Sequence, residues 1–224
     1  MLQMSSALVV RFLLTLIVSL ALTMAPSAAY AAKTIDIGDA RALPLGSTVT
    51  IKGTVTVASG AFRSSTFDAG FALQDKSGGI YVSLPTNLGL QLRDQAEVTG
   101  QLADSFGLLI LVPASPADVK SKGHGRPVTP AAVSTGSVNE ATEGRLVVVE
   151  GAITQAVTND LPYGYKFYVN DGSGEIQIFV SASTGIDLSG LTPGQHVRVI
   201  GFSAQFDTTY ELQPRVQADI TVLR

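Results

Sequence analysis

The clearest pattern in the chain is an alternation of apolar and polar residues that pauses at a short polar turn and then resumes. It covers residues 167–181, which read FYVNDGSGEIQIFVS. Alternation with a period of two, interrupted by Asp-Gly-Ser-Gly, predicts two antiparallel strands joined by a tight hairpin. One face of this hairpin is expected to be buried. Its apolar positions are Phe167, Val169, Ile176, Ile178 and Val180.

The same pattern occurs a second time at residues 71–84, which read FALQDKSGGIYVSL. Its apolar positions are Phe71, Leu73, Ile80, Val82 and Leu84. Two flanking pairs of segments also match, 46–53 with 144–151 and 89–100 with 190–201. The three pairs begin 96, 98 and 101 residues apart. Offsets that change so little indicate a duplicated domain in which insertions are confined to loops.

Each copy contains five strand-like segments. Besides the two arms of the hairpin, the first copy has 49–57, 96–102 and 108–112, and the second has 145–157, 196–202 and 209–213. A long first strand followed by a hairpin and two further strands is typical of the small, partly open five-stranded barrel called the OB fold. The pattern therefore predicts an all-β protein with two tandem five-stranded OB-fold (Greek-key) barrels.

The expected domain boundaries follow from the repeat and from composition. Residues 32–120 form the first OB-fold domain and residues 137–224 the second. Residues 121–136, rich in Gly, Pro and basic side chains, are expected to be a linker.

The hairpins resemble the central hairpin of OB-fold nucleic-acid-binding domains, including the anticodon-binding type, whose pattern reads roughly Phe-x-Leu-x-Asp-Gly-Ser-Gly-x-Ile-x-Val-x-Val. Residues 39–55 (DARALPLGSTVTIKGTV) are also similar to the start of OB modules in secreted bacterial nucleases and related extracellular hydrolases. The resemblance covers both copies. It implies the fold and a nucleic-acid-binding class, whereas its Gly and apolar positions report the barrel and not a reaction.

The first 31 residues have the pattern of a signal peptide helix. Arg11 precedes the apolar run Phe12 to Leu22, and Ala29-Tyr30-Ala31 supplies the small-x-small pattern at which cleavage is expected, after Ala31. The alternative is an uncleaved membrane anchor, but the run is short for a bilayer span of about 20 residues. We therefore expect a periplasmic or secreted protein with no stable membrane anchor after cleavage.

Composition narrows the chemistry. The chain has no Cys and two His, which removes the usual zinc ligand sets, thiol nucleophiles and disulfides. Neither His124 nor His196 is tied by the sequence to a Ser or Asp partner. Residues 170–175 lack the ligand spacing of a calcium-binding EF-hand. We expect no catalytic residues, no metal and no cofactor, and thus a protein that is not an enzyme.

Candidate binding residues follow from the OB architecture, in which ligands lie across strands two and three and are gripped by the adjoining loops. The predicted ligand-binding residues are Phe62, Arg63, Lys76, Tyr81, Tyr163, Tyr165, Lys166, Tyr168, Phe179 and Phe206, with Phe67 and Phe106 flanking them. Rings on this face stack on bases, and the basic side chains reach phosphates.

The resulting hypothesis is an exported, non-catalytic protein that binds single-stranded nucleic acid or oligonucleotides. Two alternatives stay open. An envelope or extracellular module would use the same rings to bind a saccharide or a partner protein. The rings would instead be structural if the two barrels bury them against each other. A net charge of −3 also weighs against phosphate binding.

Overall fold

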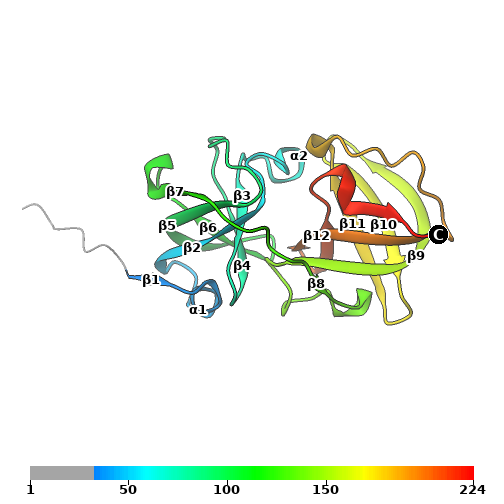
Figure 1. Cartoon of the computed structure of the whole chain (residues 1–224), viewed down its shortest axis with the longest axis horizontal. Coiled ribbons are helices and arrows are strands. Elements are labelled where there is room, and N and C mark those ends of the chain that lie inside the picture. The colour runs from blue at the N-terminus through cyan, green and yellow to red at the C-terminus, as the bar shows by residue number, and fades with distance from the viewer. Residues whose placement is uncertain (1–32) are drawn as a thin grey trace, which may run out of the picture. The chain divides into compact units, whose positions relative to one another are not determined.

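The computed structural model describes residues 33–224, whose regular secondary structure is mainly β-strand (Figure 1). Their longer strands belong to two seven-stranded sheets. The all-β prediction is therefore confirmed. The predicted signal peptide lies outside the described residues. Within residues 33–224, no helix combines the length and apolar character that crossing a membrane requires.

The first sheet contains a closed five-stranded barrel. Its strands are β1 (Thr34–Ile35), β2 (Thr48–Val57), β3 (Phe71–Gln74), β4 (Gly79–Val82), β5 (Asp94–Ser105), β6 (Leu108–Val112) and β7 (Val119–His124). The sheet order is β1-β2-β3-β4-β6-β5-β7, and a further pairing of β2 with β5 closes the ring from β2 to β6. This is the five-stranded barrel that the sequence predicts. Three short helices accompany it, α1 (Ile37–Arg41), α2 (Arg63–Thr66) and η1 (Pro116–Asp118).

The second sheet repeats the pairing order of the first. Its strands are β8 (Ala131–Ala132), β9 (Leu146–Asp160), β10 (Gly164–Asn170), β11 (Glu175–Ser181), β12 (His196–Phe206), β13 (Thr209–Gln213) and β14 (Ile220–Val222). The hairpin strands β10 and β11 pair, β11 runs parallel to β13, and β12 pairs with both β13 and β9. Its short helices are η2 (Thr135–Ser137), η3 (Ala182–Thr184) and η4 (Gln217–Asp219).

The segment expected to be a linker, 121–136, takes part in both sheets. It includes most of β7, which pairs with β5, and all of β8, which pairs with β9. The chain thus passes from the edge of one sheet to the edge of the other within six residues, 125–130.

The apolar positions of each hairpin fill the core of its own sheet, as predicted. Phe71, Leu73 and their alternate neighbours in the first hairpin are fully buried, and so are Phe167 and Val169 in the second. Burying a side chain of this size stabilises the fold by about 1.5–3 kcal/mol. Because the side-chain period is two, the intervening residues of each hairpin point away from the core.

Each hairpin turn is tied to the segment that leads into its sheet, an arrangement we call the hairpin clasp. In the first copy, Asp75 Oδ2 accepts a hydrogen bond from the Ile37 amide (2.8 Å), and its Oδ1 accepts from the Ser77 amide (2.7 Å). Ser77 Oγ accepts from the Gly38 amide (2.8 Å). The Asp-x-Ser sequence therefore satisfies backbone donors of both the turn and helix α1.

The second copy repeats the clasp at equivalent positions. Asp171 accepts hydrogen bonds from the Thr135 amide (3.0 Å) and the Ser173 amide (2.9 Å). Ser173 Oγ accepts from the Gly136 amide (2.9 Å). The Asp-x-Ser sequence that marks both hairpins thus has a structural role in each copy.

The clasp makes part of the stability pH-dependent. Burial raises the pKa of Asp75, but its hydrogen bonds from Ile37, Ser77 and Gly78 outweigh burial and leave the pKa below its ordinary value of 3.8. A carboxyl whose pKa is lowered by folding stabilises the folded state above its unfolded pKa. That contribution is lost as the pH falls through the lower, folded pKa.

We predict that Asp75→Asn lowers the free energy of unfolding at pH 7 by about 1–3 kcal/mol. The amide nitrogen would place a donor against the Ile37 amide, which is itself a donor. Urea unfolding followed by circular dichroism measures the difference, which should shrink between pH 5 and pH 2 as the wild-type carboxyl protonates. The control Asp39→Asn removes an exposed carboxyl of α1 that makes no side-chain hydrogen bond among residues 33–224. Equal losses in both variants would contradict the clasp.

Candidate functional site

The outward face of the first hairpin meets strand β12 of the second sheet in a shared apolar cluster. Phe202 of β12 packs against Phe62 and Tyr81 of the first sheet, with ring centroids 6.3 and 6.2 Å apart. The cluster is completed by Val57, Ala72, Ile110 and Ala204. The two sheets therefore pack directly against each other through buried side chains.

Hydrogen bonds and an ion pair also connect the two sheets at this interface. Arg41 donates to Glu143 at 2.9 Å, and the buried Glu143 carboxylate also accepts from the Leu109 amide at 3.2 Å. Burial raises the pKa of Glu143, while Arg41 acts in the opposite direction. The Gln74 side chain accepts from the Leu146 amide at 2.7 Å. These bonds satisfy polar groups that the interface removes from water.

Two glycines allow the backbones to approach. A Cβ at Gly79 would overlap the carbonyl oxygen of Gly144, and a Cβ at Gly144 would overlap the carbonyl oxygen of Gly79. Gly144 also has a left-handed backbone, with φ +80°. Neither position accepts a side chain without separating the sheets.

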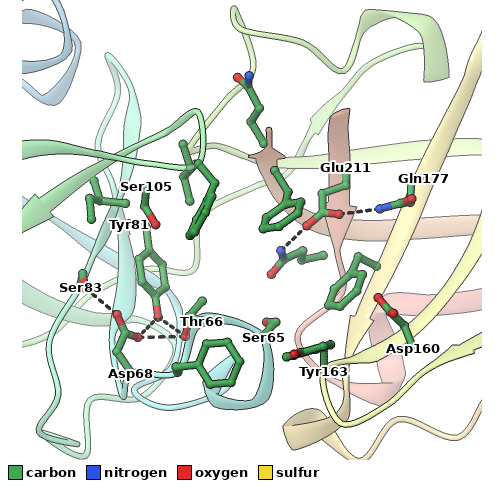
Figure 2. A pocket seen from close by; sticks show the side chains of 18 of the residues that line it. Ser65, Thr66, Asp68, Tyr81, Ser83, Ser105, Asp160, Tyr163, Gln177 and Glu211 are labelled. Carbon is green, nitrogen blue, oxygen red and sulfur yellow. Dashed lines mark hydrogen bonds between the residues drawn. The ribbon is translucent and has the colours of Figure 1, made fainter. Parts of the chain in front are cut away.

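A cavity of about 540 Å³ lies beside this interface, and both sheets supply its walls (Figure 2). The first sheet contributes the β2–β3 loop, β4 and the turn between β5 and β6. The second contributes the β9–β10 turn, the β10–β11 hairpin and strands β12 and β13. The lining includes the side chains of Phe67, Asp68, Tyr81, Ser105, Phe106, Asp160, Tyr163, Lys166, Gln177, Phe179, Phe206, Glu211 and Gln213.

Equivalent faces of the two copies form these walls. In the first sheet Tyr81 of β4 lies beside Ile110 of β6, and in the second Gln177 of β11 lies beside Glu211 of β13. The strands correspond in the pairing order of the two sheets. The faces that an OB fold uses for ligands therefore confront each other across one cavity.

Two aromatic pairs join the copies at the cavity. Phe67 meets Tyr163 edge to face, with ring centroids 5.5 Å apart, and Phe106 meets Phe206 at 5.3 Å. Each pair comes from equivalent loops of the two copies. Phe67 and Phe106 are 74% and 69% exposed and have left-handed backbones, with φ 58° and 53°. Bulky residues rarely adopt this conformation, and where they do it is often at ligand-binding sites.

The wall of the second sheet is a buried polar network. Glu211, 4% exposed, accepts hydrogen bonds from the side-chain amides of Gln177 (2.7 Å) and Gln213 (2.6 Å). Tyr168 donates to the amide oxygen of Gln177 at 3.0 Å. Burial raises the pKa of Glu211. A buried carboxyl with a shifted pKa at a cavity is a candidate functional group.

The wall of the first sheet is centred on Asp68. Its carboxylate accepts hydrogen bonds from Tyr81 (2.7 Å), Ser83 (2.6 Å) and Thr66 (3.0 Å), as Figure 2 shows. Burial, and then the nearby Asp68 charge, raise the pKa of Tyr81, so its hydroxyl stays a donor. Asp68 is thus fully engaged in holding the wall together.

The structure brings five of the ten predicted residues to this cavity. They are Tyr81, Tyr163, Lys166, Phe179 and Phe206. Tyr81 and Phe179 were expected to be open to solvent, but they are 3% and 6% exposed, and Phe202 of the second sheet covers Tyr81. Phe62 is buried in the shared cluster for the same reason.

The other predicted residues lie elsewhere. Arg63 is exposed on α2, and Lys76 is exposed beside Asp36, 3.5 Å away. Tyr165 packs against the core of the second sheet. Tyr168 is half-buried and lines a smaller cavity of about 330 Å³.

The sequence prediction missed Asp68, Glu211 and Gln213. A signal existed for Glu211, because it occupies the position of Ile110 in the first copy. A carboxylate at a position that is apolar in the other copy marks a departure from the barrel pattern. Across residues 33–224, no cluster of three or more His, Cys, Asp or Glu is placed to hold a metal ion.

Comparisons with known proteins return OB folds among solved structures. The OB domain of a Methanosarcina mazei protein is 13% identical (TM-score 0.36; 43% of this chain and 86% of that chain covered). A HINb domain is 14% identical (0.37; 80% and 96%), and a replication protein A heterotrimer bound to single-stranded DNA is 16% identical (0.33; 43% and 83%). No protein-family model and no curated protein matches the chain. The strand pairings carry the fold assignment.

We predict that Gly79→Ala destabilises the protein by about 1–3 kcal/mol, because the added methyl group overlaps the Gly144 carbonyl. Thermal and urea unfolding measure the loss. Gly190→Ala is the matched control, since a Cβ there meets nothing within 4 Å and its backbone is not left-handed. It should change stability by less than about 0.5 kcal/mol. If both variants unfold alike, the sheets do not meet at Gly79.

Proposed function

We propose that this protein binds a small organic ligand in the cavity between its two sheets, each sheet acting as an OB-fold domain that contributes its ligand-binding face. One observation carries the proposal: equivalent loops of the two copies meet as aromatic pairs around a cavity of about 540 Å³. Ligand pockets typically enclose about 300–1,000 Å³ and combine apolar walls with a few polar groups. This cavity has that size and that composition.

The charge of the lining favours a neutral or cationic ligand. Three carboxylates, Asp68, Asp160 and Glu211, line the cavity against one ammonium, that of Lys166. Asp160 already binds the Lys166 ammonium at 2.7 Å. A phosphate in this space would meet the excess negative charge of the lining, which opposes its binding.

We also propose that the protein acts without catalysis and is exported. The first point is supported by the engagement of Asp68 in structural hydrogen bonds, which leaves it no base or nucleophile function. The second is supported by the signal-peptide pattern of residues 1–31. A saccharide is within the proposed class of ligands, since OB folds bind oligosaccharides as well as oligonucleotides.

Single-stranded nucleic acid is a second candidate. The observation that favours it is the exposure of Phe67, Phe106 and Phe206, whose rings offer stacking surfaces outside the closed interface. Stacking of one base on an aromatic ring contributes about 1–3 kcal/mol. Bases would then lie over the aromatic pairs, with the backbone directed away from the cavity.

We predict that ligands which bind the cavity raise the melting temperature of the wild type but not of Ser105→Trp, in which an indole fills the space beside Phe106. Differential scanning fluorimetry with a panel of small amines, sugars and nucleosides measures the effect. A ligand at a concentration one hundred times its dissociation constant stabilises the folded protein by about 2.7 kcal/mol. Ser121→Trp, on the exposed strand β7, is the control and should respond like the wild type. Failure of the whole panel, or an unchanged response in Ser105→Trp, would exclude the cavity.

We predict no saturable binding of an oligothymidylate of about 15 nucleotides, a length that spans a typical OB site, at micromolar protein and about 50 mM salt. The reason is the acidic lining. Fluorescence anisotropy measures the binding. Saturable binding that weakens with salt and is reduced by Phe67→Ala would establish the second candidate instead.

A further inference from the structure

Glu211 is a buried acid with no opposite charge from residues 33–224 in contact with its carboxylate. Burial raises its pKa by more than the Lys166 ammonium, acting from a greater distance, lowers it. Among the residues that the structure describes, no Lys, Arg or His lies within 4.0 Å of its carboxylate, whereas Asp160 and Glu143 each have a cationic partner. Lys166, the one basic residue of the lining, is held by Asp160. Buried charges in proteins are normally paired, because desolvation without a partner is costly. The missing partner points to a cation that the chain itself does not supply.

One hydrogen-bond acceptor next to Glu211, the side-chain oxygen of Gln213, has no donor within residues 33–224. The amide nitrogens of Gln177 and Gln213 both donate to the carboxylate, so each side-chain amide is oriented with its oxygen away from Glu211. The Gln177 oxygen accepts from Tyr168. The Gln213 oxygen is buried and accepts from no atom of the described residues, although Gln213 is only 8% exposed. A ligand that satisfies this wall must bring N–H or O–H donors.

Apolar and aromatic surface lies in the same cavity. Leu108 and Ile110 of the first sheet line it, together with the Phe106–Phe206 pair and Phe179. A cation with an apolar body gains from burial of that body and from attraction of its charge to aromatic faces. The Lys166 ammonium already lies 5.8 Å from the centre of the Phe179 ring, so this ring accepts a cation.

We propose that the cavity binds the primary ammonium group of a small amine with an apolar or aromatic body. The ammonium lies against Glu211 and donates a hydrogen bond to the free oxygen of Gln213, while the body packs against Phe106 and Phe206. The inference rests on the proposed function and specifies the ligand of that site. Because burial raises the pKa of Glu211, its ionised form is costly in the free protein, and a bound ammonium offsets that cost.

The test compares three probes that each join a phenyl ring to a polar group through two methylene groups, and that differ in the charge of the polar group. They are 2-phenylethylamine, 2-phenylethanol and 3-phenylpropanoate, and isothermal titration calorimetry on the purified protein at pH 7 measures their affinities. We expect the amine to bind at least about tenfold more tightly than the alcohol, as a charge-assisted hydrogen bond implies. The carboxylate should bind more weakly than the alcohol.

Variants assign the preference to the named atoms. Glu211→Gln should reduce the preference for amine over alcohol to less than about threefold, since the charge is gone while the shape is kept. Gln213→Met removes the free acceptor and should weaken the amine more than the alcohol, which serves as the readout if Glu211→Gln fails to fold. Glu150→Gln, an exposed site on β9 outside the cavity lining, is the matched control and should keep the wild-type preference.

Three results overturn the inference. One is equal binding of all three probes to the wild type; if Ser105→Trp then blocks them, the cavity still binds ligands and only the ammonium assignment fails. The second is an amine preference that survives in both Glu211→Gln and Gln213→Met. Absence of amine binding also rejects the ammonium assignment, while the proposed function is judged separately by the sugars and nucleosides of the panel.

Discussion

The direct packing of one sheet on the other is the constraint on which the remaining features depend. The backbones touch at Gly79 and Gly144, where no side chain holds them apart. This approach lets Phe202 enter the cluster that contains Phe62 and Tyr81. Faces that a single OB barrel would expose to solvent become the two walls of one cavity. The location of the site is therefore a property of the pair and of neither copy alone.

The two copies share the residues that build the sheets and differ at those that line the cavity. The Asp-x-Ser clasp occurs in both, at Asp75 and at Asp171, and it ties the hairpin to the preceding segment in the same way. At the cavity, Tyr81 corresponds to Gln177 and Ile110 to Glu211. The two copies of one frame thus carry different walls: the first places Ile110 where the second places the buried carboxylate of Glu211.

The sequence was sufficient to predict features that depend on neighbouring residues in the chain. The period-two alternation around Phe71 and Phe167 predicted which hairpin positions are buried, because pleated strands place alternate side chains on opposite faces. The strand order of the barrel followed from the hairpin and the long first strand. Tyr81 and Phe179, which the alternation places on the outward face of each hairpin, lie outside the cores of the two sheets.

The contacts between the two sheets, which cover some of those outward-facing residues, could not be predicted from the alternation of apolar and polar residues. The contacts that bring the sheets together join residues far apart in the chain, such as Gln74 with Leu146 and Arg41 with Glu143. Such contacts depend on side-chain shape and on hydrogen-bond geometry, which hydrophobic patterning does not record. The burial of Phe62, Tyr81 and Phe179 was for this reason visible only in the structure.

The replacement of Ile110 in one copy by Glu211 in the other has a consequence for recognition. Two identical halves facing each other would offer any guest two equivalent ways of lying between them. Because Glu211 is matched by Ile110 in the other half, the reversed pose would turn the ammonium end of the guest toward isoleucine at this pair of positions. A near-symmetrical scaffold has in this way acquired a direction, because the amino-acid differences between its halves give a bound guest a head and a tail.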